Sequence, residues 1–495
     1  MSPSFDDIPR PRLWTRFLAG AVLIVFATAS AASVATFREV DRVVNALSPN
    51  PDLKLGGDLA KTDPGKPQTI MLLGSDRRPK GATDGSAGSG ARSDTILLVR
   101  LDPERRATAL MSLPRDLKVE IPGRGTAKIN EAYELGGPRL TLRTVKRLTG
   151  LQINHVVNVD FEGFRAAVDA IGCIYADIDR RYFNDSPQFS YIDVRQGYQR
   201  LCGEEALEYA RFRHEDNDLV RSARQQDLLR EAKQQVGVGA LVDDRDKLIK
   251  IFGRYTTSDS ELKTRGGILR LLKLAVFSVD QPIREVHFEG QITGGDESTG
   301  TPSYVVASDA KVKKFAAQFL GVEDTEGPRG ELRPKGKGGG GLGRGADPDG
   351  GLEKAPIEGK DQALQAIQQG AGKRLPVYYP TVRVKASLFG GPPRFYKIRT
   401  PDGKFKTSYR MVVKRGLVGE YYGIQGTTWK KPPILASPAE TRRMGGRTFE
   451  VHYDGDRVRL VAWRTSKAVY WVSNTLLQTL TERQMLAIAR STRLP

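Results

Sequence analysis

The sequence predicts an α/β domain with a central mixed sheet flanked by helices, followed by a smaller α+β domain. Three short, continuous apolar runs at 69–74, 95–101 and 107–113 have the length and composition of fully buried strands. Helical patterns follow at 139–149 and 161–170, and strands mixed with helices favour α/β layers. A chain of 495 residues is long enough for two or three domains, each with its own core.

The composition excludes several classes of protein. The chain carries 77 Lys and Arg residues against 58 Asp and Glu residues, and the formal net charge of +19 favours an anionic partner. Hydrophobic residues make up 39% of the chain, which excludes a polytopic membrane protein and a wholly disordered chain. Two cysteines exclude a four-cysteine zinc site, and the four histidines lack the HExxH spacing of a zinc hydrolase.

The N-terminal region predicts a membrane anchor. Residues 17–37 form an uncharged run of 21 residues, which at about 1.5 Å per residue is long enough to cross a bilayer core. Three arginines precede this run, and positive charge favours the cytoplasmic side. We therefore expect a cytoplasmic tail at 1–16, a single transmembrane helix at 17–37 and a stalk at 38–66, with the rest of the chain extracellular. The small residues that end the run leave a cleaved signal peptide as the alternative.

Charged residues lie where the first three predicted strands begin and end. If neighbouring strands are antiparallel, the end of the first, the start of the second and the end of the third meet at one edge of the sheet. Asp76, Asp94 and Arg115 would then lie together. Two carboxylates at one edge repel each other unless a cation neutralises them, and Mg²⁺ prefers such oxygen ligands. The alternative is that these residues are solvated loop charges.

The segment 209–225 holds the densest group of arginines. If 209–213 is extended, Arg211 and Arg213 share one face, and in a predicted helix at 218–235 Arg221 and Gln225 share another. Arginine forks bind phosphate oxygens in a bidentate manner, so phosphate or pyrophosphate is the expected occupant. The alternative is a surface on which these arginines pair with neighbouring carboxylates.

The second half of the chain predicts a linker and an accessory domain. We expect a flexible Gly/Pro-rich linker at 323–374. This linker contains a GxGxxG pattern, but no predicted strand precedes it, so we do not expect a phosphate-binding loop there. Residues 375–495 predict an accessory α+β domain of unknown function, with a hairpin around 401–403 and a closing helix within 476–489. Its tryptophans are more typical of a sheet core than of a sugar-binding platform.

Several short motifs follow one another along the predicted first domain. They are Leu73-Gly-Ser-Asp-Arg77, Ser93-Asp-Thr95, Pro114-Arg-Asp116, Lys128-Ile-Asn-Glu-Ala-Tyr133, Asp160-Phe-Glu-Gly-Phe164, Val168-Asp-Ala-Ile-Gly172, Gly203-Glu-Glu-Ala-Leu207, Arg211-Phe-Arg213 and Asp218-Leu-Val-Arg-Ser-Ala-Arg-Gln225. Together, over about 67–322, these motifs resemble the LytR-CpsA-Psr (LCP) family of bacterial cell-envelope proteins. Cys173 departs from the family, in which many members have a second glycine after Gly172.

The resemblance implies an LCP-like catalytic domain at 67–322 that moves a glycopolymer from a polyprenyl-pyrophosphate carrier onto peptidoglycan through a phosphodiester. It also implies pyrophosphatase activity and an apolar tunnel for the polyprenyl tail between the sheet and its helices. Asp76 and Asp94 would hold Mg²⁺ (or Mn²⁺). The expected pyrophosphate ligands are Arg115, Lys128, Asn130, Arg211, Arg213, Arg221, Arg224 and Gln225.

The expected catalytic residues are Asp94, Arg115 and Arg213. An acceptor hydroxyl would attack the sugar-side phosphorus, with arginines and Mg²⁺ stabilising the developing charge and Asp94 accepting the proton. The alternatives are a non-catalytic protein that binds anionic wall polymer, and a lipid-pyrophosphate phosphatase whose acceptor is water. We expect no nucleic-acid partner, because the short cytoplasmic side holds no helix-turn-helix pattern.

An extracellular location also bears on the two cysteines. Outside the cytoplasm a pair of cysteines is more often bridged than free, so we expect a disulfide between Cys173 and Cys202. This disulfide would close the loop between residues 173 and 202, and closing a loop of that length stabilises the fold by roughly 3 kcal/mol in the chain-entropy model. The alternative is a pair of buried free thiols.

Overall fold

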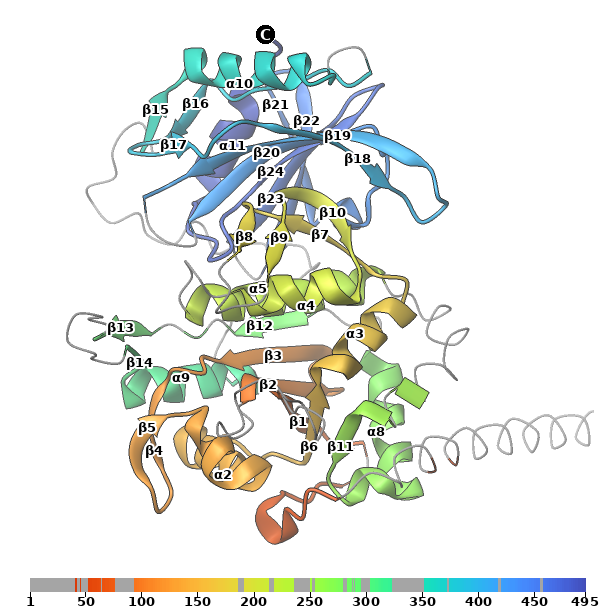
Figure 1. Cartoon of the computed structure of the whole chain (residues 1–495), viewed down its shortest axis with the longest axis vertical. Coiled ribbons are helices and arrows are strands. Elements are labelled where there is room, and N and C mark those ends of the chain that lie inside the picture. Colours follow the sequence, from red (N-terminus) through yellow and green to blue (C-terminus); the bar gives the residue numbers. More distant parts are fainter. Residues whose placement is uncertain are drawn as a thin grey trace, which may run out of the picture.

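The computed structural model describes residues 52–75, 93–185, 191–212, 218–235, 250–278, 283–322 and 351–495, less residue 64 and short gaps inside the last three ranges, together with the isolated positions 41 and 45. These residues form an N-terminal domain (52–322) and a C-terminal domain (351–495), stacked on each other (Figure 1). The predicted anchor at 17–37 lies outside the described residues. Within the part that is described, the helices are too short or too polar to span a membrane.

A six-stranded mixed sheet forms the centre of the N-terminal domain. Its order is β11-β6-β1-β2-β3-β12. The strands are β1 (Gln68–Ser75), β2 (Ser93–Asp102), β3 (Ala107–Leu113), β6 (His155–Asp160), β11 (Thr256–Ser258) and β12 (Ile283–Val286). The first three form the predicted antiparallel meander, whereas β6 runs parallel to β1 and β12 parallel to β3. The predicted mixed sheet is therefore confirmed.

Helices cover both faces of this sheet (Figure 1). On one face, α2 (Glu131–Thr149) and α9 (Asp309–Leu320) pack in one core with Met71, Leu98 and other inward side chains of the strands. On the other face lie α3 (Phe161–Ala170), α4 (Gly203–Arg211) and α5 (Asp218–Gln235). A further helix, α8 (Arg265–Ser278), packs beside β2. Apolar side chains at both faces explain why the strands read as continuous hydrophobic runs.

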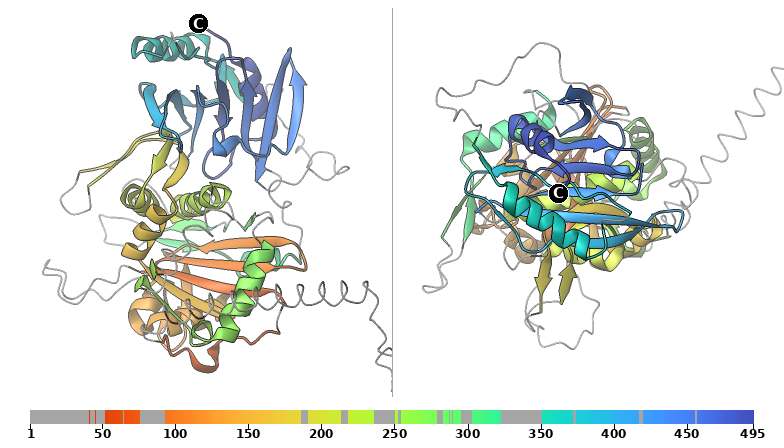
Figure 2. Two further views of the ribbon diagram at one scale, coloured as in Figure 1. Left: turned by 90° about the vertical axis from the view of Figure 1, so that its right-hand side faces the viewer. Right: turned by 90° about the horizontal axis from the view of Figure 1, so that it is seen from above.

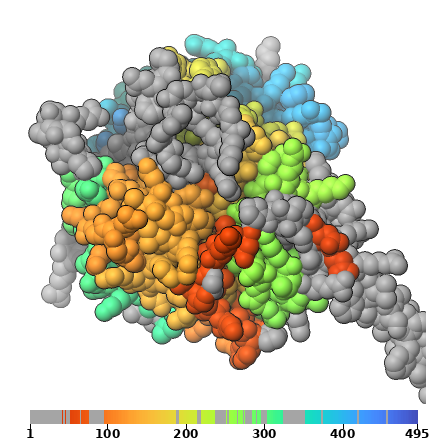
Figure 3. Space-filling view, turned by 60° about the horizontal axis from the view of Figure 1, so that its bottom comes forward, coloured from red at the N-terminus to blue at the C-terminus, as the bar shows by residue number. Residues whose placement is uncertain are grey.

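The N-terminal segment is fastened to α2. The short helix η1 (Gly56–Asp58) places Asp58 within 2.7 Å of Arg139 Nε and 3.0 Å of Arg143 Nε. Burial acts to raise the pKa of Asp58, but these two guanidinium groups lower it below its usual value. Figure 3 shows this segment lying across the face of the molecule beside α2 and α8.

Among the described residues of this domain, four two-stranded ribbons extend from the sheet and its helices. They are β4 (Lys118–Ile121) with β5 (Gly125–Lys128), β7 (Ile174–Ile178) with β10 (Gly197–Leu201), β8 (Tyr182–Asn184) with β9 (Ile192–Val194), and β13 (Gln291–Thr293) with β14 (Tyr304–Val306). The predicted disulfide between Cys173 and Cys202 is present, and it closes the base of the β7–β10 ribbon.

The C-terminal domain is an eight-stranded antiparallel sheet with a helix at each end of its chain. Its elements are β15 (Leu352–Lys354), α10 (Pro356–Gln368), β16 (Val382–Val384), β17 (Leu388–Phe389), β18 (Arg394–Arg399), β19 (Phe405–Lys414), β20 (Tyr421–Thr427), η3 (Pro433–Leu435), β21 (Glu440–Met444), β22 (Arg447–Asp454), β23 (Arg457–Arg464), β24 (Val469–Ser473) and α11 (Glu482–Ser491). The predicted hairpin is β18–β19, and the predicted closing helix is α11. Trp463 and Trp471 are fully buried, which confirms the core interpretation for these two rings.

Three predictions about the elements are wrong. The linker does not reach 374, because 351–371 folds into β15 and α10 and buries Ala363 and Ala366 in the C-terminal core. The segment at 209–213 is not extended through Arg211, since α4 continues to that residue. The stalk does not reach 66, because the segment around η1 packs on the N-terminal domain and buries Leu55 in its core.

Candidate functional site

The ends of three strands meet at one edge of the N-terminal sheet, as the meander predicted. Ser75 pairs with Ser93 and Gly74 with Thr95, so a bulge places the backbone of Asp94 opposite the end of β1. Leu113 pairs with Ile96, so Arg115 follows β3 at the same edge. Asp76 and the side chain of Asp94 lie outside the described residues.

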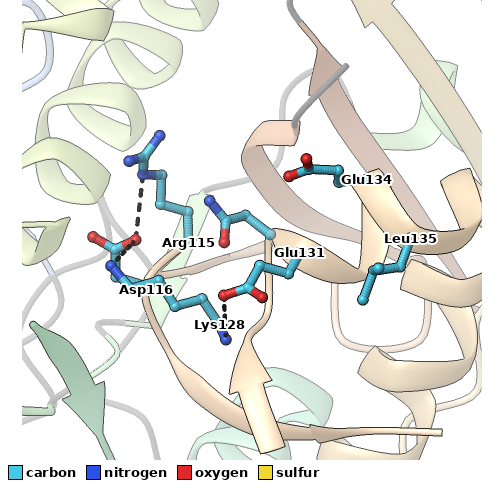
Figure 4. Close-up of a pocket in the computed structure, with 7 residues that line it drawn as sticks. Arg115, Asp116, Lys128, Glu131, Glu134 and Leu135 are labelled. Carbon is cyan, nitrogen blue, oxygen red and sulfur yellow. Dashed lines mark hydrogen bonds and ion pairs between the residues drawn. The ribbon is translucent and has the colours of Figure 1, made fainter. Parts of the chain in front are cut away.

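A pocket of about 420 Å³ opens beyond the end of β3 (Figure 4). Its lining combines two cations, three carboxylates, an amide and one apolar side chain. These residues are Arg115, Asp116, Lys128, Asn130, Glu131, Glu134 and Leu135. Arg115 and Asn130 are both buried, so their polar groups are held in a restricted, low-dielectric environment.

Asp116 joins the two cations of this pocket. Its Oδ1 lies 3.6 Å from Arg115 Nε and 3.2 Å from Lys128 Nζ. The carboxylate therefore fixes where both positive groups lie, although it also neutralises part of their charge. Lys128 Nζ additionally lies 5.7 Å from the centre of the Tyr304 ring, on β14.

Hydrogen bonds join the backbone around this cluster: one links the segment after β3 to the residue before α2, and another links the end of β5 to the start of α2. The amide of Asn130 donates to the carbonyl of Arg115 at 3.2 Å, and the amide of Lys128 donates to Glu131 Oε1 at 3.2 Å. Among the residues that the structure describes, the buried Oδ1 of Asn130 has no hydrogen-bond partner. A buried acceptor without a partner is costly, and a ligand hydroxyl could satisfy it.

A kink in α2 shapes the pocket wall. Gly136 and Gly137 leave helical geometry, with φ −158° and +61°, and Pro138 follows them. The turn before the kink presents Glu131, Glu134 and Leu135 to the pocket (Figure 4).

Arg211 lies at the same edge of the sheet. Its guanidinium group lies 4.2 Å from the centre of the Phe161 ring. Phe161 directly follows Asp160, the residue of β6 that pairs with Ser75 at the end of β1. The end of α4 and the carboxyl end of β1 are therefore neighbours, while Arg213 lies outside the described residues.

The predicted ligands Arg224 and Gln225 on α5 contact the end of α4. Arg224 is fully buried and donates to the carbonyls of Tyr209 at 2.8 Å and Phe212 at 2.5 Å, and Gln225 Nε2 donates to the carbonyl of Ala210 at 3.3 Å. These contacts fasten the end of α4, so they place Arg224 in a supporting position for Arg211. Arg221 is also buried, one helical turn before Gln225.

The sequence matches the LytR_cpsA_psr family over residues 23–319. The chain belongs to this family.

Curated relatives of this chain include named teichoic acid transferases. The polyisoprenyl-teichoic acid–peptidoglycan teichoic acid transferase TagU of Oceanobacillus iheyensis is 28% identical over 323 residues, which cover 63% of this chain and 94% of that protein. TagV of Bacillus subtilis, which carries the same transferase name, is 33% identical over 216 residues, covering 42% of this chain and 54% of that one. The solved structure of Bacillus subtilis TagV aligns at 26% identity with a TM-score of 0.42, covering 52% of this chain and 96% of that one.

The LytR_cpsA_psr match ends at 319, so the C-terminal domain lies outside it. Within the match, Asp116, Glu131 and Glu134 line the pocket but were not among the predicted site residues, although Asp116 and Glu131 stand inside two of the quoted motifs. The sequence feature that indicates Asp116 as a pocket residue is its position directly after Arg115, at the end of a predicted strand.

Proposed function

We propose that this LytR_cpsA_psr protein is a membrane-anchored phosphotransferase. It moves a glycopolymer from a polyprenyl-pyrophosphate carrier onto peptidoglycan through a phosphodiester link. The observation that supports this best is the convergence of the ends of β1 and β3 and the start of β2 at one sheet edge, where Arg115, Asp116 and Lys128 line a pocket. The names of its transferase relatives agree with this reaction.

In the proposed reaction, a sugar hydroxyl of the acceptor attacks the sugar-side phosphorus. The P–O bond to the departing polyprenyl phosphate breaks, and the hydroxyl proton passes to the carboxylate of Asp94. Arg115 and Lys128 stabilise the charge that develops on the phosphoryl oxygens, because preorganised cations in a restricted pocket are effective there. Arg211 at the end of α4 and Arg221 of α5 bind the pyrophosphate together with Arg213, while Arg224 and Gln225 hold the end of α4.

We propose that Asp76 and Asp94 hold a divalent cation. The bulge between β1 and β2 places the backbone of Asp94 opposite Ser75, the residue that precedes Asp76 in the sequence, and carboxylates are ligands that Mg²⁺ prefers. Mg²⁺, or Mn²⁺ in its place, would supply positive charge to the phosphoryl oxygens when bound.

We also propose that residues 17–37 anchor the protein in the cell membrane, with the folded domains outside the cell. This places the pocket on the side where a polyprenyl carrier presents its glycan and where peptidoglycan is found. The polyprenyl tail would then run between the sheet and its helices.

The proposal can be tested by incubating the purified protein with Mg²⁺ and a polyprenyl-pyrophosphate glycan, with and without peptidoglycan fragments. We expect a phosphodiester-linked glycan–peptidoglycan product that depends on Mg²⁺. Arg115→Ala should lower its rate by about 100-fold or more, since the cation acts on developing charge. Release of glycan phosphate alone, unchanged by the fragments, would identify a phosphatase instead. Salt-sensitive binding without turnover would identify a wall-binding protein.

A further inference from the structure

Helix α5 links the candidate site to the C-terminal domain. Its first half carries Arg221, Arg224 and Gln225, and the last two hold the end of α4. Its second half carries Arg230 and Glu231, whose side chains meet the C-terminal domain. Figure 2 shows the C-terminal domain resting on α5 and on the β7–β10 ribbon beside it.

The two domains share an apolar core. Tyr175 of β7 and Tyr198 of β10 are buried in one cluster with Ile434, Trp471 and other residues of the C-terminal domain. The Tyr198 and Trp471 rings lie 5.8 Å apart, and Tyr198 Oη accepts a hydrogen bond from the Ile434 amide at 3.3 Å. Buried rings with satisfied polar groups are typical of a permanent interface.

The same ribbon is fastened to the end of α5. The Gln235 side chain accepts from the Tyr175 amide at 2.7 Å and donates to the Tyr175 carbonyl at 2.6 Å. The C-terminal domain therefore contacts α5 directly, and it also contacts the β7–β10 ribbon, which is hydrogen-bonded to the end of α5.

Two buried ion pairs make the direct contact. Arg459 Nη1 lies 2.7 Å from Glu231 Oε1, with side-chain exposures of 9% and 0%. Arg230 Nη2 lies 3.0 Å from Asp454 Oδ2 and also pairs with Glu285 of β12. Burial opposes the charge of Arg230, but Asp454, Glu285 and Asp227 hold its pKa well above its usual value. Charges buried in this way need their partners, because removal of one partner leaves the other desolvated.

A helix transmits displacement along its axis. Glu231 lies six residues after Gln225, about 9 Å along the helix at 1.5 Å per residue. A shift of the second half of α5 therefore moves Arg221 and Arg224, and through Arg224 it moves the end of α4 that carries Arg211.

We propose that the C-terminal domain positions α5 for pyrophosphate binding, with Arg459 and Asp454 as its positioning residues. The inference rests on the proposed function of the sheet-edge site. It gives the C-terminal domain, which lies outside the family match, a role in the affinity of that site for its substrate.

A charge exchange in the full chain tests this role. The variants are Arg459→Glu, Glu231→Arg and the double variant, and the probe is octaprenyl pyrophosphate with Mg²⁺. Each single variant should weaken the Kd by about 10-fold or more and speed amide exchange of residues 218–225, because it places like charges together in a buried site. The double variant should restore both values to within about 3-fold of wild type, since it restores the pair.

Arg464→Glu is the matched control. Arg464 lies on the same strand as Arg459, but its partner is Glu450 within the C-terminal domain and it is exposed. This variant should leave the Kd and the exchange of 218–225 within about 2-fold of wild type, as expected of an exposed pair.

If a charge reversal prevents folding, a milder substitution at the same residue provides the test. Arg459→Lys keeps the charge and loses the planar fork, and it should weaken the Kd and loosen 218–225 to a smaller degree. A folded Arg459→Lys or Arg459→Glu variant with wild-type Kd and wild-type exchange in α5 would overturn the inference. If wild type itself fails to bind the probe, the proposed function fails, and the exchange of 218–225 still decides whether the domains are coupled.

Discussion

At the scale of single residues, Asp116 organises the pocket by contacting both of its cations. A carboxylate between two cations orients them, and it also lowers the cost of keeping them close together before an anion binds. Its role is thus to position Arg115 and Lys128, which touch the phosphate in the proposed reaction.

We expect Asp116→Asn to lower the rate of glycan transfer by about 10-fold or more, because Arg115 and Lys128 lose their common anchor. The free energy of unfolding should fall by only about 1 kcal/mol, since the carboxylate is partly exposed. Transfer assays and urea unfolding measure the two effects. Asp193→Asn is the control, because Asp193 also contacts two arginines and has the same 17% side-chain exposure. Equal transfer by the Asp116 and Asp193 variants would refute this role.

Cys173 is a residue whose backbone geometry favours glycine. Its φ is +69°, a left-handed conformation, and it follows Gly172 at +85°. A side chain in this region is unfavourable by about 1–2 kcal/mol. A glycine at this position would avoid that strain, whereas this chain forms a disulfide with Cys202 there.

Two variants that remove the same disulfide should therefore differ in stability. Each loses roughly 3 kcal/mol of stabilisation from the crosslink. Cys173→Gly also relieves the left-handed strain, so it should be more stable than Cys202→Ser by about 0.5–1 kcal/mol after the entropy of glycine in the unfolded chain is considered. Urea unfolding of the two proteins, with reduced wild type as a reference, measures this difference. The opposite ranking would show that the strain at Cys173 is negligible.

At the scale of elements, the kink in α2 depends on a conformation that only glycine adopts readily. Gly137 has φ +61° and ψ −161°, whereas Gly150 at the end of the same helix has φ +69° and ψ 3°. A Cβ added at either position meets no atom within 4 Å, so backbone strain alone distinguishes the two.

Gly137→Ala should destabilise the protein by about 2–3 kcal/mol, because its conformation is almost exclusive to glycine. Gly150→Ala should be destabilising by about 1 kcal/mol, since other residues reach the left-handed helical region at modest strain. Gly137→Ala should in addition weaken substrate binding, because it displaces the turn that carries Glu131, Glu134 and Leu135. Urea unfolding and KM for the glycan substrate test both expectations; equal effects of the two alanines on both measures would contradict them.

At the scale of the whole molecule, the two domains share a buried interface that contains apolar rings and ion pairs. The interface buries Tyr175 and Tyr198, and its ion pairs include Asp177 with Arg410 at 2.6 Å. Asp177 also accepts a hydrogen bond from Trp471 Nε1 at 3.1 Å. An N-terminal domain on its own would expose these rings and leave Asp177 and Glu231 without their arginine partners.

A chain ending at 322 should therefore be less stable than the full chain by several kcal/mol, because loss of one partner of a buried pair typically costs about 3–5 kcal/mol. It should aggregate or unfold at a markedly lower temperature, whereas the full chain should show a single calorimetric transition. Asp177→Asn with Glu231→Gln in the short chain should recover part of the loss. A short chain that unfolds at the temperature of the full chain would show that the domains are independent.

The sequence alone determined the elements whose patterns are local. The buried strands of the meander, the hairpin at β18–β19 and helix α3 were predicted from hydrophobic runs, alternation and turn residues that lie next to one another in the chain. The position of Arg115 and of the Asp94 backbone at one sheet edge followed from the antiparallel order. The disulfide followed from the number of cysteines and the expected compartment.

Only the tertiary structure decided what the long polar side chains contact. Arg224 fits a phosphate ligand by its spacing, yet it is buried against the carbonyls of α4. Arg459 and Glu231 are 228 residues apart, and nothing in their local sequence marks them as partners. Hydrophobic periodicity determines which face of an element is buried. The partner of a buried charge, in contrast, depends on which distant elements fold beside it. The spacing of residues along the chain therefore does not predict that partner.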